Sequence, residues 1–486
     1  MKYIPTIGLE IHAELKTRTK MFCACRNDPD EKRPNLNICP VCMAHPGALP
    51  VINREAVKKV LLVGAALQGT LADYTEFDRK NYFYPDIPKG YQISQYKHPL
   101  VSGGELLGVR LTRVHLEEDT ARSQHPSTSS GQAPISLIDF NRAGVPLMEL
   151  VTEPVIESAE QAGAFARELQ LLLRYLNASE ANMEKGEMRV EANVSVSARS
   201  NLAETGEAGP LGTKVEVKNL NSFRSVERAV AFEVQRQSEL LERGEEVVQE
   251  TRGWDEQKQV TFSQRKKESS HDYRYFPDPD LPSLLLSEIP EFSKEVLAKE
   301  LPELPWQKRD RYLKLGFKLE DAEFFVNEPQ FVKTLLDGVI EKTQSDLDIL
   351  RLASNYILSD LRGYSTDLNM PGSIENINPE TFVMLMQMIK TSNVSSRGAK
   401  EILAEMYKSG GNPETIAKEK DLLQQSDEGA LKTIAQKIID ANPKVVADYR
   451  AGKQAALQFL IGQGMKESKG SANPEALREE MLKKLR

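Results

Sequence analysis

The strand and helix signals of this 486-residue chain change at residues 276–282, FPDPDLP. Before this segment, apolar and polar residues alternate with a period of two at several places, among them IGLEIHAEL (7–15), MRVEANVSVS (188–197) and TKVEVKNL (213–220). Such alternation predicts half-buried β-strands. Strands and helices are therefore mixed in the first part of the chain.

Helix signals in the first part are clearest at 159–176, where the apolar residues share one face: Phe165, Leu169, Leu172, Leu173 and Leu176. Ser158 and Gln161 form a capping box at its start. HPSTSSGQAP (125–134) has no apolar periodicity and predicts a mobile loop.

After residue 282 only helix signals remain. Asn-Pro recurs as a helix opener at Asn378-Pro379, Asn412-Pro413, Asn442-Pro443 and Asn473-Pro474. Asn suits the N-cap, and Pro suits the first helical position because its missing N–H would be unpaired there. We therefore predict an α+β domain over 1–285, an all-α middle domain over 286–399 and a helical tail over 400–486.

Composition limits the classes of protein that fit. The chain has 40% hydrophobic and 28% charged residues, which is typical of a soluble globular protein. No apolar run reaches the roughly 18 residues of a membrane span, and the N-terminus lacks a signal-peptide core, so we expect a cytoplasmic protein without a membrane partner. The net charge of −8 disfavours non-specific nucleic-acid binding but allows a local basic patch.

All four cysteines lie in one segment, as Cys23-Ala-Cys25 and Cys39-Pro-Val-Cys42. Two close pairs in a chain of this class predict a structural Zn²⁺ site with four thiolate ligands. The alternative is four reduced thiols in a loop, since the one-residue gap of the first pair is tighter than usual.

Several acidic residues lie in strand-like segments. In VHLEEDTA (114–121), alternation puts Glu118 on one face and His115, Glu117 and Asp119 on the other, while Glu149 lies inside an apolar run. A buried carboxylate needs a cation or a hydrogen-bond donor. An oxygen-rich Mg²⁺ site formed by Glu10, Glu118 and Glu149 with His12 would satisfy this need, with His12 binding directly or through water. Separate surface charges are the alternative.

Two polar and aromatic segments accompany these acids. FDRKNYFYPDIPKGYQISQY (77–96) contains Lys80, Asn81 and Lys89, and SSHDYRYFPDPDLP (269–282) contains Arg274. Cations beside carboxylates suit phosphoryl transfer, in which a metal bridges the phosphates. The chain has no GxxxxGK[ST] or GxGxxG motif, so the pattern indicates metal-dependent phosphoryl chemistry without a P-loop. An aromatic core with a solvated charged rim is the alternative.

The longest motifs match one family. IGLEIHAELKT, HLEEDTA, NRAGVPLMELVTEP, KNLNSF, DYRYFPDPDLP, SSRGAKEI and KGSANP, together with the segment 77–96, closely resemble the B subunits of the aspartyl/glutamyl-tRNA(Asn/Gln) amidotransferases, the GatB family. The resemblance extends over essentially the whole chain.

The resemblance implies an activity and a fold. Enzymes of this family are ligases that use ATP to activate the side-chain carboxylate of misacylated Glu-tRNA(Gln) or Asp-tRNA(Asn) to an acyl phosphate. Ammonia released from glutamine by the amidase (A) subunit then displaces phosphate, and a small C subunit completes the heterotrimer. The B subunit would perform the kinase and transamidation steps in an antiparallel cradle domain similar to glutamine synthetase and guanidino kinases.

The resemblance also implies roles for individual residues. Carried over by motif, the Mg²⁺ site falls on His12, Glu118 and Glu149, with Glu10 beside it. Lys80, Asn81, Lys89 and Arg274 are expected to contact ATP phosphates or the acylated adenosine. The helical tail is expected to bind the outer body of the tRNA. Members of the family that lack the cysteines show that zinc is not essential to the chemistry, and the loop 125–134 is longer than usual.

Two other functions compete with this one. A non-catalytic tRNA-binding scaffold would be favoured by loss of Glu10, His12, Glu118 or Glu149, and all four are present. A glutamine synthetase-like kinase of a small molecule would give no reason for the helical tail. Which of the two misacylated tRNAs is used does not follow from the sequence.

Overall fold

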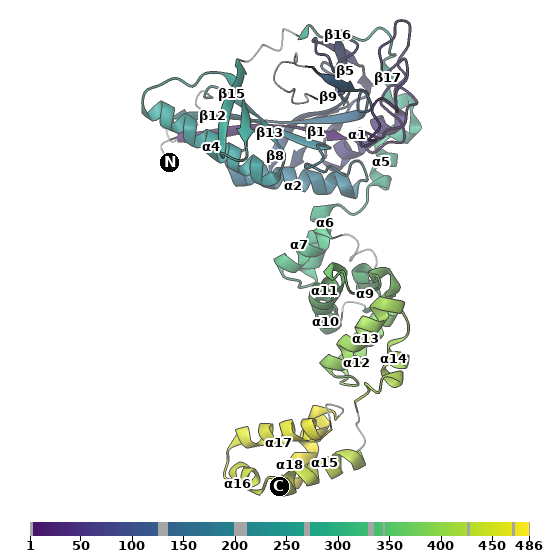
Figure 1. The fold of residues 1–486 in the computed structure, drawn as a ribbon, viewed down its shortest axis with the longest axis vertical. Helices are drawn as coiled ribbons and strands as arrows, with labels where there is room; N and C mark the ends of the chain where they lie inside the picture. Colours follow the sequence, from purple (N-terminus) through teal and green to yellow (C-terminus); the bar gives the residue numbers. More distant parts are fainter. Residues whose placement is uncertain are drawn as a thin grey trace. The chain divides into compact units, whose positions relative to one another are not determined.

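A computed structural model describes residues 3–124, 135–198, 211–266, 273–328, 335–343, 346–424, 428–468 and 472–485 (Figure 1). The predicted loop at 125–134 lies outside the described residues. The chain divides into two compact units, Met1–Pro305 and Trp306–Arg486. The first contains all the strands of the described chain, and the second is helical, so the α+β organisation predicted from the sequence is confirmed.

A ten-stranded sheet forms the centre of the first unit, in the order β15-β14-β13-β12-β1-β11-β8-β6-β2, with β7 paired to β8. Neighbouring strands are antiparallel except for the parallel pair β13–β14. The strands are β1 (Tyr3–Glu14), β2 (Thr70–Leu71), β6 (Val101–Ser102), β7 (Glu105–Leu106), β8 (Val109–Glu118), β11 (Pro146–Thr152), β12 (Met188–Ala198), β13 (Val215–Leu220), β14 (Glu250–Asp255) and β15 (Val260–Lys266). The three strands predicted from alternation are β1, β12 and β13.

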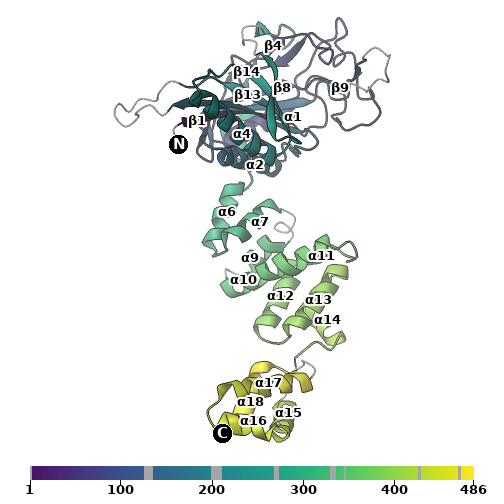
Figure 2. The ribbon, with the colours of Figure 1, turned by 60° about the vertical axis from the view of Figure 1, so that its left-hand side comes forward.

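Helices and small sheets cover opposite faces of this sheet (Figures 1 and 2). The helices α2 (Ala159–Tyr175) and α4 (Phe223–Glu242) lie side by side on one face, and α1 (Arg54–Ala66) packs near β8. On the other face lies a three-stranded sheet of β16 (Phe276–Pro277), β4 (Asp78–Asn81) and β5 (Tyr91–Ser94). Two further pairs join β9 (Arg122–Gln124) to β10 (Leu137–Asp139), and β3 (Tyr74–Thr75) to β17 (Leu284–Leu285).

Helix α2 confirms the predicted cap and apolar face. The Ser158 hydroxyl accepts a hydrogen bond from the Gln161 backbone N–H at 3.1 Å, and the Gln161 side chain accepts one from the Glu157 N–H at 3.0 Å. The side chains of Phe165, Leu169 and Leu172 are completely buried. Burial of this face fixes α2 beneath the sheet, because it removes a large apolar area from water.

The remaining helical elements follow the last strand. The first unit ends with η2 (Leu286–Glu288), η3 (Pro290–Phe292) and α5 (Lys294–Glu300). The second unit contains α6 (Pro305–Lys314), α7 (Leu319–Asn327), α9 (Asp337–Thr343), α10 (Leu347–Tyr356), η5 (Ile357–Leu361), α11 (Arg362–Thr366), η6 (Ile374–Asn376), α12 (Pro379–Lys390), α13 (Ser396–Ser409), α14 (Pro413–Glu419), α15 (Glu428–Ala441), α16 (Pro443–Arg450), α17 (Gln454–Glu467) and α18 (Pro474–Leu485).

The four Asn-Pro pairs open helices, as predicted: α12, α14, α16 and α18 each begin at the proline. Three asparagines act as N-caps, since Asn378, Asn412 and Asn473 accept hydrogen bonds from the N–H two residues later. Asn442 differs, because its side-chain amide donates to the Ile438 carbonyl instead. The proline therefore sets the helix start even where the asparagine cap is absent.

The predicted domain limits differ from the divisions in the structure. The two compact units meet at Pro305–Trp306 rather than at 285, and residue 400 lies inside α13. The last four helices have an apolar core of their own, made of buried residues between Leu431 and Leu485. In the described part of the chain, no helix has the length and apolar character needed to cross a membrane.

Candidate active site and metal centre

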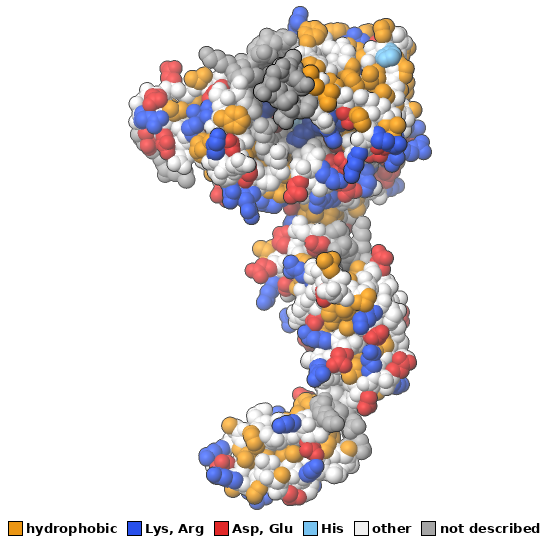
Figure 3. All heavy atoms as spheres, in the orientation of Figure 1, with side chains coloured by type: hydrophobic (Ala, Val, Ile, Leu, Met, Phe, Trp, Pro, Cys, Tyr) orange, Lys and Arg blue, Asp and Glu red, His pale blue; other side chains and the backbone are white. Residues whose placement is uncertain are grey.

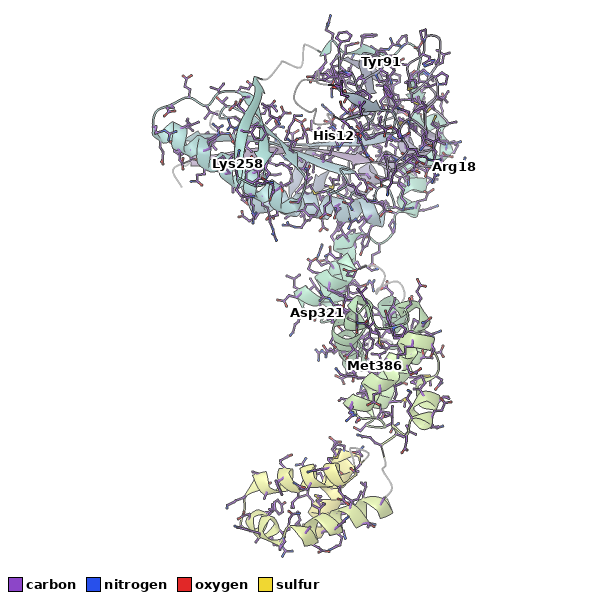
Figure 4. All side chains as sticks on the ribbon, viewed as in Figure 1. His12, Arg18, Tyr91, Lys258, Asp321 and Met386 are labelled. Atoms are coloured by element: carbon purple, nitrogen blue, oxygen red, sulfur yellow. The ribbon has the colours of Figure 1, made fainter. Side chains whose placement is uncertain are left out.

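The register of three central strands places ionisable side chains next to one another. His12 on β1 lies directly opposite Glu149 on β11, and Glu149 lies opposite His115 on β8. Directly opposed residues of antiparallel strands share one face of the sheet. Figure 4 shows His12 at this face, below the small sheet that contains Tyr91.

His12, Glu117 and Glu149 form a tight cluster there. One ligand atom of each lies within 4.8 Å of the others. The His12 Nε2 atom lies 3.5 Å from Glu117 Oε1 and 3.4 Å from Glu149 Oε2. The two carboxylates are buried, whereas the His12 side chain is 17% exposed. The cluster is therefore open to solvent mainly on the side of the imidazole.

Glu118, which the sequence analysis assigned to the metal, lies elsewhere. Its Oε1 atom lies 2.6 Å from the Lys89 ammonium and accepts a hydrogen bond from the Ile93 N–H. Both Glu118 and Lys89 line a cavity of about 300 Å³ beside the cysteine segment. Because side chains alternate along β8, only one of two consecutive glutamates can face His12, and it is Glu117.

Neighbouring cations keep the buried carboxyl groups ionised. Burial opposes the charged form of both, yet Lys80 and His12 hold the pKa of Glu117 below its usual value. For Glu149, His115 and His12 overcome burial and hold the pKa well below its usual value. Burial also opposes the charged forms of His12 and Lys80. The charges of Glu149 and Glu117 outweigh it and raise the pKa values of both groups well above their usual values.

Two carboxylates and an imidazole that converge in this way fit a divalent cation. The observation that supports the fit is the chemistry of the donor set: two carboxylate oxygens and one imidazole nitrogen lie within 4.8 Å of one another, and the imidazole would release its proton on binding a metal. Mg²⁺ is bound by one or two carboxylates and keeps several water ligands, which the exposed side of the cluster would accommodate.

His115, on the neighbouring strand β8, holds the Glu149 carboxylate in its orientation. Its side chain is 2% exposed, and its Nε2 atom lies 3.2 Å from Glu149 Oε2. Arg113 Nε donates a hydrogen bond to His115 Nδ1, so that Nε2 carries the proton directed at the carboxylate. This arrangement is typical of the groups that hold metal ligands in place.

Glu10 belongs to a second acidic cluster rather than to the first. It lies opposite Glu191 of β12, and ligand atoms of Glu10, Glu191 and Glu216 lie within 4.8 Å of one another. The Lys218 ammonium lies 2.7 Å from Glu191 and 3.6 Å from Glu216. Only Glu10 of this group was singled out from the sequence, because the others depend on the pairing of β1, β12 and β13.

The four residues expected to contact ATP phosphates or the acylated adenosine have different environments. The positive charge of Lys80 interacts with the carboxylates of the His12 cluster, and Lys89 forms an ion pair with Glu118. The Asn81 side chain donates hydrogen bonds to the carbonyls of Tyr273 and Arg274, which ties β4 to the segment before β16. Arg274 is exposed and has a φ of 44°, and within the described residues no carboxylate lies at ion-pair distance from it. Lys89 is therefore paired with a carboxylate, whereas within the described residues Lys80 and Arg274 have none at ion-pair distance.

Aromatic rings lie around Lys80. Tyr96 and Tyr275 are stacked with ring centroids 4.3 Å apart, and Tyr273 packs edge-on against Tyr82. The Lys80 ammonium lies 5.4 Å from the Tyr273 ring centroid. Burial, with the charges of Glu117 and Glu149, raises the pKa of Tyr275 to about 12 although Lys80 opposes it, so this hydroxyl stays protonated near the cluster.

The four cysteines form a separate centre. Sulfur atoms of Cys23, Cys25, Cys39 and Cys42 lie within 4.8 Å of one another. Zinc–sulfur bonds of about 2.3 Å at tetrahedral angles place two sulfurs about 3.8 Å apart, and the Cys39–Cys42 separation is 3.9 Å. The Cys39 N–H donates a hydrogen bond to Cys42 Sγ. The hydrogen bond with Cys23, and the charge of Lys20, lower the pKa of Cys42 to about 5 against the effect of burial. The set fits Zn²⁺.

Comparison with known proteins assigns this chain to a family. The model of the GatB/GatE catalytic domain matches residues 5–290, and that of the GatB domain matches residues 336–485. The chain belongs to the GatB family. Its relatives include B subunits of aspartyl/glutamyl-tRNA(Asn/Gln) amidotransferase. The subunit from Thermotoga maritima is 42% identical, over 100% of this chain and 99% of the relative. The subunit from Thermus thermophilus is 43% identical, over 99% of both chains. The resemblance stated from the motifs is confirmed over the full length.

We expect Glu117→Gln to weaken binding of Mn²⁺, a spectroscopic substitute for Mg²⁺, by about tenfold or more, because the amide removes one unit of ligand charge. Glu118→Gln is the matched control, since it makes the same chemical change at the next residue. It should bind Mn²⁺ as the wild type does. Titration followed by electron paramagnetic resonance measures both. Loss of binding in Glu118→Gln alone would restore the assignment made from the sequence.

We expect one zinc per chain in protein purified without chelator, bound by the four cysteines. Elemental analysis and thiol titration test this directly. Cys39→Ser should lower thermal stability more than turnover, because a site with four protein ligands leaves no position for substrate. Four freely titrating thiols in metal-free protein would contradict the assignment.

Proposed function

We propose that this chain activates the side-chain carboxylate of an aminoacyl group on misacylated tRNA with ATP and transfers ammonia to it. Its relatives are named as amidotransferase subunits, and this family belongs to glutamine-dependent ligases that form carbon–nitrogen bonds. The observation that carries the proposal is the His12–Glu117–Glu149 cluster beside Lys80, a constellation suited to phosphoryl transfer without a P-loop.

The chemistry requires activation because a carboxylate is a poor acceptor for ammonia. In the proposed first step, a carboxylate oxygen of the substrate attacks the γ-phosphorus of ATP, and ADP leaves. In the second, ammonia attacks the carbonyl carbon of the acyl phosphate, and inorganic phosphate leaves with the electron pair of the broken bond. The product is Gln-tRNA or Asn-tRNA for protein synthesis.

The residues of the cluster would take distinct roles. A magnesium ion held by His12, Glu117 and Glu149 would offset negative charge on the transferred phosphoryl group. His115 keeps Glu149 oriented through its Nε2 proton. The Lys80 ammonium, held charged by the same carboxylates, would attract the phosphates of ATP. Arg274, which is exposed, would meet the phosphates or the acylated end of the tRNA.

The second acidic cluster would serve the cation that accompanies the nucleotide. Glu191 and Glu216 already share a cation, the Lys218 ammonium, so the cluster that they form with Glu10 suits positive charge. The aromatic side chains around Lys80 would stack on a purine, either of ATP or of the terminal nucleotide of the tRNA. We place these contacts in the N-terminal cradle domain predicted by the resemblance.

The proposed partners are the amidase subunit, the small C subunit and the tRNA. The helices from α15 onward would contact the tRNA body. Figure 3 shows basic and acidic side chains interspersed on the face of these helices that is in view, so recognition would depend on placement rather than on a uniformly basic surface. Shape and backbone contacts suit a structured RNA, which offers few readable base edges.

We expect Glu117→Gln and Glu149→Gln to lose nearly all ATP-dependent amidation in the assembled enzyme, because each removes charge from the proposed cation site. Glutamine hydrolysis by the partner subunit should remain measurable. Amidation at wild-type rates in both variants would contradict the assignment, and parallel loss of glutamine hydrolysis would indicate failed assembly.

We expect deletion of residues 428–486 to weaken tRNA binding strongly while glutaminase activity and subunit assembly persist. A second variant replaces four lysines of this region by Ala: Lys466, Lys483, Lys484 and Lys469, the last of which lies outside the described residues. Each lost phosphate contact should reduce the slope of log binding constant against log salt concentration by about 0.7–0.9. An unchanged Michaelis constant for tRNA in the truncated enzyme would show that these helices serve stability alone.

A further inference from the structure

Lys20 is a fully buried cation that has no carboxylate partner among the residues that the structure describes. Its side chain is 0% exposed, and its ammonium donates hydrogen bonds to the carbonyls of Asn37 at 2.7 Å and Phe140 at 3.1 Å. Among the residues that the structure describes, no carboxylate lies within 4 Å of this ammonium. The carbonyls satisfy its hydrogen bonds, but they carry no net charge.

A buried charge of this kind is costly. An ammonium removed from water loses solvation that two carbonyl dipoles replace only in part, and charges in protein interiors are normally paired. A buried lysine without a carboxylate partner therefore indicates that another negative charge stands close to it. The question is which group near Lys20 supplies that charge.

One candidate is the Glu118 carboxylate, whose Oε2 atom would lie 3.9 Å from a methyl group added at Gly144, but this group already pairs with Lys89. The other candidate is the cysteine centre. The Lys20 backbone N–H donates a hydrogen bond to the Cys25 carbonyl at 2.9 Å. Gly144 lies between the lysine side chain and the second cysteine pair: a methyl group added there would lie 3.7 Å from both Lys20 Cδ and Cys42 Cβ. Asn37, whose carbonyl accepts from Lys20, lies two residues before Cys39. Lys20 thus contacts the segments that carry both pairs.

Metal binding would give this centre the missing charge. Four thiolates around one divalent ion leave a net double negative charge on the cluster. We propose that Lys20 is the buried counter-charge of the cysteine metal site, holding the thiolate cluster electrostatically as well as by its two carbonyl contacts. This inference rests on the proposed zinc site, and it assigns to Lys20 a positioning role in the first unit without any part in the reaction.

The proposal has a thermodynamic signature that a simple packing role lacks. In the zinc-loaded chain, loss of the positive charge removes an attraction and should destabilise the cysteine segment. In the zinc-free chain, Cys42 is the thiol whose pKa is lowered, so Lys20 faces one thiolate rather than a doubly negative cluster, and loss of its charge should have a smaller effect. By linkage, the difference between the two effects equals the loss of zinc affinity.

The test uses the full-length chain with Lys20→Met and Lys20→Gln, and Lys16→Met as control. Glutamine is neutral but still donates to a carbonyl, so it separates charge from tethering. Lys16 lies on the same segment, but its side chain is 52% exposed and pairs with Glu180, so its replacement removes the same charge at the surface. Zn²⁺ affinity is measured by competition with a chromophoric chelator. Hydrogen exchange of residues 18–45 is measured separately, with and without zinc.

We expect both Lys20 variants to bind Zn²⁺ about 10–100-fold more weakly than wild type, whereas Lys16→Met stays close to wild type. The increase in exchange rate over wild type should be larger in the zinc-loaded variants than in the zinc-free ones. Wild-type affinity in Lys20→Gln, or equally faster exchange with and without zinc, would overturn the counter-charge role while leaving the zinc site intact. A wild-type chain that binds no zinc would overturn both. If Lys20→Met fails to fold, the affinity and exchange of Lys20→Gln decide whether the charge of Lys20 is required.

Discussion

Two buried carboxylates on adjacent strands, Glu117 and Glu149, impose the condition on which the active-site geometry depends. Ionised groups that lose water must gain cations or hydrogen-bond donors, and three are supplied: the charges of His12 from β1 and Lys80 from β4, and the Nε2–H of His115 from β8. The cluster is balanced only when the large sheet and the small sheet carrying Lys80 are both in place. A metal ion held here would take the place of the His12 proton, because an imidazole nitrogen binds a metal only when it is deprotonated.

The order of the strands explains why this site lies at the middle of the sheet. β1 pairs with both β11 and β12, so one strand contributes to two acidic clusters, His12 to the first and Glu10 to the second. Residues two apart on a strand share a face. The two clusters therefore lie on the same face, on the opposite side from α2 and α4, where a nucleotide with its cations would span them.

Local features could be predicted from the sequence because they depend on neighbours along the chain. The Ser158–Gln161 cap, the apolar face of α2 and the Asn-Pro helix starts are all of this kind. Alternation in VHLEEDTA also placed Glu117 on the face of His115, and the structure has Glu117 there, beside His12. The motif comparison selected Glu118 instead, and the structure shows that it pairs with Lys89.

Contacts between distant strands could not be predicted in this way. Glu191 and Glu216 join Glu10 only because β12 pairs with both β1 and β13, with a register shift between Val190 and Ala192. A shift of one residue would turn these carboxylates to the helix side of the sheet. Lys20 likewise gives no signal in the sequence, because its burial depends on the segments around Asn37 and Phe140.

Phosphorylation of the substrate carboxylate leaves a signature in the oxygen atoms of the released phosphate. Misacylated tRNA carrying ¹⁸O in the side-chain carboxylate of its amino acid is converted by the assembled enzyme with ATP and glutamine, and the inorganic phosphate is examined by mass spectrometry. An acyl phosphate requires one carboxylate oxygen to pass to phosphate, so with both oxygens labelled we expect singly labelled phosphate in amounts equal to the amide formed. Unlabelled phosphate at full amidation would contradict phosphorylation of the carboxylate.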